Sequence, residues 1–125
     1  MRCVKVFFDG GCRPDPGTME IAVVAAGRTI ILPDVGQGTS TDAEWLALIH
    51  ALEVAQALDL SDFVLIGDAA DIVAKANGAV KCRGSALHHL ERFHALPSVG
   101  MRPRVRHIRR SQNLAGIALA KRHPR

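Results

Sequence analysis

The chain has 125 residues, of which 48% are hydrophobic and 22% charged, and its formal net charge is +4. This length and apolar content predict one folded domain, 1–125, and exclude a disordered chain. Three cysteines without a CxxC spacing disfavour a disulfide framework or a zinc site, and no apolar run reaches the roughly 18 residues of a membrane span. We therefore expect a cytoplasmic protein with reduced thiols and no membrane partner. Its basic balance suits a polyanionic partner such as nucleic acid without proving one.

The first half of the chain predicts three strands and a long helix. β-Branched and aromatic residues predict a strand over 2–8, and two further strands over 18–26 and 28–32 are joined by a tight link typical of a hairpin. A glycine-rich loop follows, and then Leu, Ala and Glu predict a helix over 42–58.

The second half alternates between strands and helices. A strand over 62–68 precedes helices over 69–78 and 85–96, and a strand over 102–110 precedes a closing helix over 112–123. The order β-β-β-α-β-α-α-β-α predicts an α/β protein with a mixed sheet and helices packed on it. The crossover through the long helix is expected to be right-handed.

Three carboxylates are expected to meet at one edge of this sheet. Asp9 and Asp68 each end a predicted strand, and the carboxyl ends of parallel strands are where ligands of α/β sheets bind. Glu44 falls on the apolar face of the long helix, where an unpaired charge costs several kcal/mol. It either reaches back to Thr41 in a capping box or faces the two aspartates, and the helix pattern leaves both interpretations open.

Three acids at one edge repel one another unless a cation joins them. Hard oxygen ligands at an open site suit Mg²⁺ or Mn²⁺, and carboxylates that hold two such ions are the usual device for in-line displacement at phosphorus. Gly10 and Gly11 would let a backbone approach this site closely.

Four segments, in order, resemble the ribonuclease H family, type 1, over essentially the full chain. They are "FFDGGCRPDPG", "TSTDAEWLALIHALEVA", "VLIGDAADIV" and "HIRRSQNLAGIALAKR". The resemblance implies a ribonuclease H-like five-stranded mixed sheet, with three antiparallel strands followed by two parallel ones, flanked by helices. It also implies cleavage of the RNA strand of an RNA–DNA hybrid with two divalent ions and no covalent intermediate.

Matched residue by residue, the resemblance implies that Asp9, Glu44 and Asp68 are the catalytic carboxylates and metal ligands. Together with the glycine and arginine arguments, it gives a set of expected nucleic-acid contacts: Gly10, Gly11, Cys12, Asp15, Ser40, Thr41, Arg109, Arg110 and Asn113.

One departure from the family pattern leaves two functions open. Ile117 occupies the place of the family's fourth acid, and its spacing from Leu114 and Ala118 is typical of packing. The three remaining acids favour a metal-dependent endonuclease, whose activity the missing fourth acid would weaken. Ile117 favours a non-catalytic nucleic-acid-binding module on the same scaffold.

The arginines of the last predicted strand also have two interpretations. Arg102, Arg104 and Arg106 point the same way on a strand, and such a basic face either guards a sheet edge or contacts phosphates. Arg109 and Arg110 lie closer to the expected site and are the better phosphate ligands.

Overall fold

The central strand of the sheet is built from alternating residues of the N-terminal segment. In β1 (Val4–Cys12), Val6 and Phe8 are 0% and 2% exposed and belong to the main core. Phe7 packs on the opposite face, against the smaller cluster that includes Ala115. Because successive strand residues point to opposite faces, Asp9 lies on the same face as Phe7.

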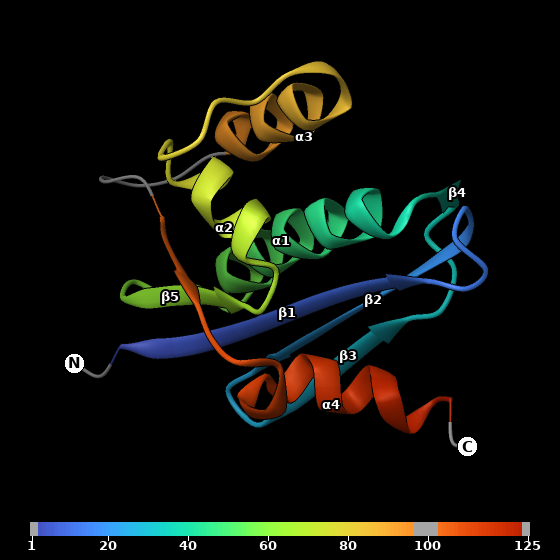
Figure 1. Cartoon of the computed structure of the whole chain (residues 1–125). Coiled ribbons are helices and arrows are strands. Elements are labelled where there is room, and N and C mark those ends of the chain that lie inside the picture. Colours follow the sequence, from blue (N-terminus) through green and yellow to red (C-terminus); the bar gives the residue numbers. More distant parts are fainter. Residues whose placement is uncertain (1–2, 97–102, 124–125) are drawn as a thin grey trace.

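The computed structural model describes residues 3–96 and 103–123, and within them helices cover both faces of one mixed sheet (Figure 1). The strands that follow β1 are β2 (Gly17–Ala25), β3 (Arg28–Leu32), β4 (Gln37–Gly38), β5 (Phe63–Gly67) and β6 (Arg104–His107). The helices are α1 (Ser40–Ala57), α2 (Ala70–Ala76), α3 (Gly84–Ala95) and α4 (Leu114–Lys121), and the 3-10 turn η1 (Arg110–Gln112) precedes α4.

The sheet has the order β3-β2-β1-β5-β6. β1, β2 and β3 pair antiparallel, and β5 pairs parallel with both β1 and β6. This confirms the predicted five-stranded mixed sheet, to which the two-residue β4 adds a short pairing with the start of β2. Among the described helices, none is long and apolar enough to cross a membrane.

β1 is longer than the sequence predicts, which changes the position of Asp9. Its antiparallel pairing with β2 continues to Cys12, whereas its parallel pairing with β5 ends at Phe7 opposite Ile66. The prediction that Asp9 ends a strand is therefore wrong. Asp9 lies two residues beyond the last parallel pair, so it still reaches the edge at which β5 ends.

The long helix begins two residues earlier than predicted, and its cap differs. Thr39 is the N-cap: its hydroxyl accepts from the Asp42 backbone N–H at 3.1 Å, and Asp42 Oδ2 accepts from the Thr39 backbone N–H at 3.1 Å. The predicted capping box of Thr41 and Glu44 is therefore wrong. Asp42 uses its other oxygen, Oδ1, to contact His89 Nε2 of α3 at 2.9 Å, and the His89 ring stacks on Trp45.

A glycine allows α1 to approach the sheet near its start. A Cβ on Gly10 would stand 2.2 Å from the Ala43 carbonyl oxygen, a distance that no side chain can occupy. The helix therefore lies directly over β1 at this point, and its second turn is carried to the sheet edge.

Candidate active site

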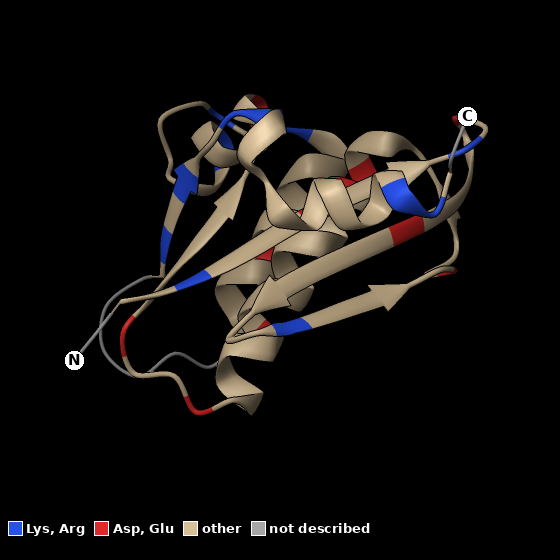
Figure 2. Ribbon diagram, turned by 90° about the horizontal axis from the view of Figure 1, so that it is seen from below, with Lys and Arg blue, Asp and Glu red and all other residues tan. Residues whose placement is uncertain are grey.

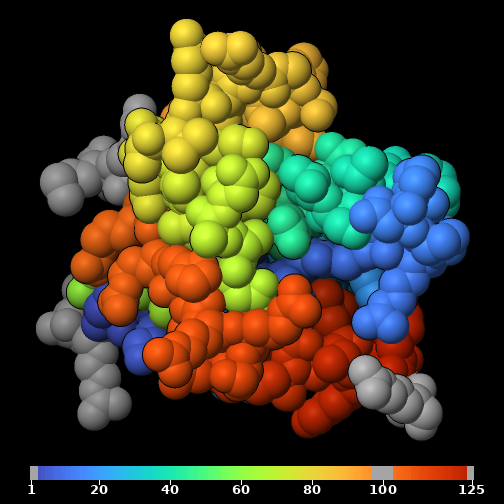
Figure 3. Space-filling model, viewed as in Figure 1, coloured from blue at the N-terminus to red at the C-terminus, as the bar shows by residue number. Residues whose placement is uncertain are grey.

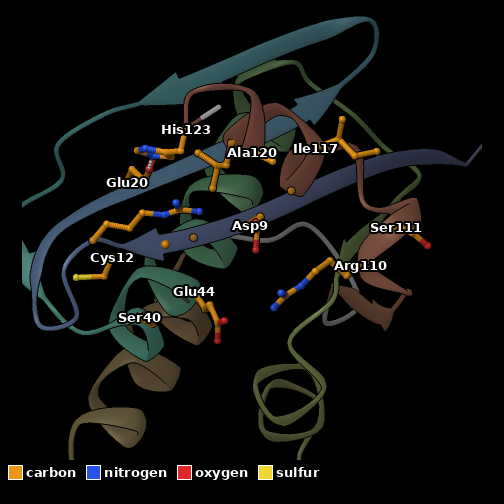
Figure 4. Close-up of a pocket in the computed structure, with 15 residues that line it drawn as sticks. Asp9, Cys12, Glu20, Ser40, Glu44, Arg110, Ser111, Ile117, Ala120 and His123 are labelled. Carbon is orange, nitrogen blue, oxygen red and sulfur yellow. Dashed lines mark hydrogen bonds and ion pairs between the residues drawn. The ribbon is translucent and has the colours of Figure 1, made fainter. Parts of the chain in front are cut away.

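Three separate elements bring the predicted carboxylates to one place. Asp9 comes from β1, Asp68 follows the end of β5 directly, and Glu44 lies near the start of α1. A Cβ at Gly116 of α4 would stand 3.2 Å from Asp9 Oδ2 and 3.5 Å from Asp68 Oδ2, so both aspartates border the first turn of that helix. In Figure 4, Asp9 and Glu44 point into a common opening that Arg110 faces from the other side.

Glu44 has no capping duty in this structure. The capping box is closed by Asp42, and the Glu44 side chain lines the cavity together with Asp9. The choice that the sequence left open is thereby decided in favour of the second interpretation, in which Glu44 faces the aspartates.

Burial and the charges of neighbouring acids raise the pKa values of Asp9 and Glu44. Burial, followed by the charges of Asp68 and Glu44, raises the pKa of Asp9 to about 7, although the Gly10 backbone N–H and Arg110 oppose this shift. Burial, followed by the charge of Asp68, likewise raises the pKa of Glu44 to about 7. The site therefore carries more negative charge than its own surroundings can stabilise, which is the condition that a bound cation relieves.

The donor set fits a hard divalent cation. Carboxylate oxygens are the ligands that Mg²⁺ and Mn²⁺ prefer, and Asp9, Glu44 and Asp68 supply them. Within residues 3–96 and 103–123, no group of three such side chains is already placed to hold a metal ion, so the three acids would have to draw closer together around a bound one.

Asn113 holds this arrangement together from the inside. It is completely buried, its Nδ2 donates to the Phe8 carbonyl and to Asp68 Oδ2 at 3.0 Å each, and its Oδ1 accepts from the Ala115 N–H at 3.1 Å. One side chain thus fixes β1, the third acid and the start of α4. The prediction that Asn113 contacts nucleic acid does not fit this burial, and its role is to position Asp68.

A cavity of about 510 Å³ opens beside the acids. In the space-filling view β1 is recessed between α1, α2 and α4 (Figure 3). Several predicted nucleic-acid contacts line this cavity, namely Gly10, Gly11, Cys12, Ser40 and Arg110. Thr41 and Arg109 are exposed and lie outside its lining.

Two of the predicted contacts bind each other. Asp15, in the turn between β1 and β2, accepts from the Ser40 hydroxyl at 2.6 Å and from its backbone N–H at 3.2 Å. Cys12 is buried, with its Sγ near the carbonyls of Pro14 at 3.1 Å and Gly38 at 3.2 Å. These contacts fasten the turn to the start of α1, so the wall of the cavity next to Glu44 is pre-formed.

Ile117 faces the cavity and does not pack in the core. It is 39% exposed, and its neighbour Leu114 is 47% exposed, so the predicted packing stripe is wrong. An aliphatic side chain therefore stands at the rim of an acidic site.

Two arginines of β6, Arg104 and Arg106, are exposed. Arg104 forms an ion pair with Asp62 at 3.1 Å. Arg102 lies outside the described residues. β6 ends the described sheet, and Lys and Arg lie along it and also near the end of α4 (Figure 2).

Sequence reasoning missed a second charged group in the cavity. Glu20 of β2 and His123 after α4 line the same space as Asp9, at its other end. The only signal in the sequence is an acid between two apolar residues of a predicted strand, Met19 and Ile21. The structure shows that both of these neighbours are buried.

The similarity of the chain to known proteins agrees with this geometry. A family model described as reverse transcriptase-like matches residues 8–123. Ribonuclease H1 from the archaeon Halobacterium salinarum NRC-1 is 28% identical, with 94% of each chain covered and a TM-score of 0.79. No curated protein sequence matches significantly.

Two further solved structures share the fold. The N-terminal ribonuclease H domain of a Mycobacterium tuberculosis protein is 23% identical, covers 99% of this chain and 100% of that domain, and has a TM-score of 0.79. LC11-RNase H1, from a compost metagenome and solved in complex with an RNA/DNA hybrid, is 25% identical, with coverages of 89% and 88% and a TM-score of 0.68. Because the family model spans nearly the whole chain, the protein belongs to the reverse transcriptase-like family and has a ribonuclease H-like fold.

Proposed function

We propose that the chain is a metal-dependent endonuclease that hydrolyses the RNA strand of RNA–DNA hybrids. The observation that carries the proposal is the meeting of Asp9, Glu44 and Asp68 beside an open cavity, with Glu44 free of any capping role. A protein that only binds phosphates gains nothing from clustered acids, because they repel the ligand. The LC11 relative in complex with an RNA/DNA hybrid supports the choice of substrate.

The residues around the cavity would have three roles: holding the metal ions, orienting one of the acids and contacting a phosphate. Asp9, Glu44 and Asp68 would hold Mg²⁺ or Mn²⁺, which when bound supplies the charge that activates a water and stabilises the departing oxygen. Asn113 keeps Asp68 oriented, and Arg110 faces the acids from across the opening, where its guanidinium suits a phosphate oxygen.

The test is cleavage of a labelled hybrid in Mg²⁺ or Mn²⁺, with the corresponding DNA duplex as the substrate control. We expect cleavage of the RNA strand alone, its loss in EDTA, and its loss in Asp9→Asn. Asp59→Asn is the matched control, because Asp59 is exposed in the turn after α1 and lies outside the cavity lining.

A non-catalytic binding module is the second candidate, and the exposed Ile117 at the rim favours it. Hybrid that is bound tightly but remains intact after long incubation with Mn²⁺ would decide for this alternative.

A further inference from the structure

The cavity has two ends of opposite chemical character. Asp9 and Glu44 lie at one end, and His123 lies beside the buried Glu20 at the other (Figure 4). Arg13 also lines the cavity. We propose that the end at His123 is a subsite for a backbone phosphate, namely the phosphate adjacent to the one that faces Asp9. The inference rests on the proposed function, because it names a second contact for the same nucleic-acid strand.

Glu20 is a buried carboxylate with two basic partners and not an isolated surface charge. Its side chain is only 8% exposed, and its two oxygens lie 2.7 and 2.6 Å from His123 Nε2, with Arg122 Nε at 3.3 Å. Its partners are partly exposed, His123 at 31% and Arg122 at 37%, so the free-energy cost of burying the carboxylate is only partly offset by these contacts. The pair therefore calls for another explanation.

The explanation that we favour is orientation of the histidine. When Glu20 occupies Nε2, the ring is fixed and its other nitrogen, Nδ1, remains available. In the described part of the chain, Nδ1 of His123 has no hydrogen-bond partner, although His123 lines the cavity. In the doubly protonated ring, whose charge both the Glu20 carboxylate and a bound phosphate would stabilise, Nδ1–H is a donor directed to the cavity at a set position.

The spacing fits successive phosphates of one strand. Asp9 pairs with Ala22 across the sheet, and Glu20 lies two residues before Ala22 on the same face of β2. Two residues of an antiparallel strand span about 7 Å, a length comparable to the separation of neighbouring phosphates in a nucleic-acid strand. A strand whose one phosphate faces Asp9 can therefore place the next one at His123.

The charges select an anion at this end. Glu20 is in contact with both Arg122 and His123, so its own charge is compensated, and Arg13 adds a cation that makes no ion pair among the described residues. A divalent cation would be repelled here, whereas a phosphate can accept hydrogen bonds from guanidinium and imidazolium groups.

The experiment removes the charge of one phosphate at a time. Hybrids with a short ribonucleotide block, which restricts cleavage to one linkage, are made with a neutral methylphosphonate at each neighbouring position in turn. Binding is measured by fluorescence anisotropy in the Asp9→Asn background, so that the readout does not require cleavage. We expect one neighbouring position at which the neutral linkage weakens binding by about tenfold, the loss of one charged hydrogen bond.

The variants decide whether His123 reads that position. His123→Gln should weaken binding of the fully charged hybrid by the same factor and should show no additional loss with the neutral linkage. Lys121→Gln is the matched control, because it removes a charge from the same end of α4 but lines the groove on the other side of the helix. Arg13→Gln, an exposed position, replaces His123→Gln if the latter does not fold.

Additive losses at every position, in His123→Gln and Arg13→Gln alike, would overturn the subsite. Cleavage of the hybrid by the wild-type protein together with such additive losses would leave the nuclease proposal standing. The expected pattern of binding without any wild-type cleavage would instead support the subsite and reject the nuclease.

Discussion

Replacing Asp9 by Asn should make the protein more stable while it abolishes cleavage. The carboxylate of Asp9 is partly buried beside two other acids, and its pKa is raised from 3.8 to about 7. A raised pKa means that the folded state binds the proton more tightly than the unfolded state does. Stability is therefore greatest below the pKa of the unfolded chain and falls as the pH rises from about 4 to about 7. The asparagine side chain has the same shape and carries no charge, so this loss does not occur.

The size of the effect follows from the pKa. A rise from 3.8 to about 7 corresponds to roughly 4 kcal/mol, since one pKa unit is about 1.4 kcal/mol. Asp9 keeps some contact with water and shares the site with Glu44, so we take about half of this value. We expect Asp9→Asn to exceed the wild type in free energy of unfolding by about 2 kcal/mol at pH 8, and by much less at pH 4.5.

The assay is urea denaturation of both proteins at the two pH values, in EDTA so that no divalent ion neutralises the site. Asp59→Asn serves as the control for the loss of an exposed carboxylate. Equal stability differences at both pH values, or a less stable Asp9→Asn protein at pH 8, would refute the view that the acids are held together against their own repulsion. Added Mn²⁺ should reverse the order, because it stabilises only the protein that binds it.

Further predictions concern the surroundings of the acids and the ligand. Asn113→Ala should lower the free energy of unfolding by about 2–4 kcal/mol in urea denaturation, because it leaves the Phe8 carbonyl and Asp68 without their donor. Gly116→Ala should reduce the cleavage rate by about tenfold or more with an unchanged circular dichroism spectrum, because the new methyl group crowds both aspartates. Ile117→Asp should tighten Mn²⁺ binding in calorimetric titration, since it adds a carboxylate at the rim, and unchanged affinity would show that position 117 does not reach the site. Hybrid affinity should fall linearly with the logarithm of salt concentration, and a flat response would argue against phosphate contacts.

Local patterns in the sequence were enough to predict the sheet and the three acids. Asp9, Glu44 and Asp68 are recognisable because each is an acid that an apolar strand or helix face does not otherwise need. The start of α1 was harder to assign, because Thr39 and Asp42 have the same spacing as Thr41 and Glu44, and both pairs are typical of a cap. Sequence alone cannot choose between them, because the choice depends on contacts with distant residues, such as that of Asp42 with His89.

Other features depend on contacts between distant parts of the chain. Asn113 and Phe8 are 105 positions apart, and Glu20 and His123 are 103 apart. Nothing local shows that the asparagine is buried or that the glutamate has a partner. Helical spacing predicts packing for Ile117 because it shows which residues share a helix face, but it does not show whether another element covers that face, and Ile117 is exposed.

The contact between Asp42 and His89 couples the position of α3 to the cap of α1. One oxygen of Asp42 closes the cap of α1 and the other contacts α3, so a partner that grips or displaces α3 also disturbs the first turn of the helix that carries Glu44. The His89 interaction holds the pKa of Asp42 below its ordinary value, so this connection persists into mildly acidic solution. A change in the position of α3 can thus alter the position of Glu44 although α3 itself does not contact the substrate.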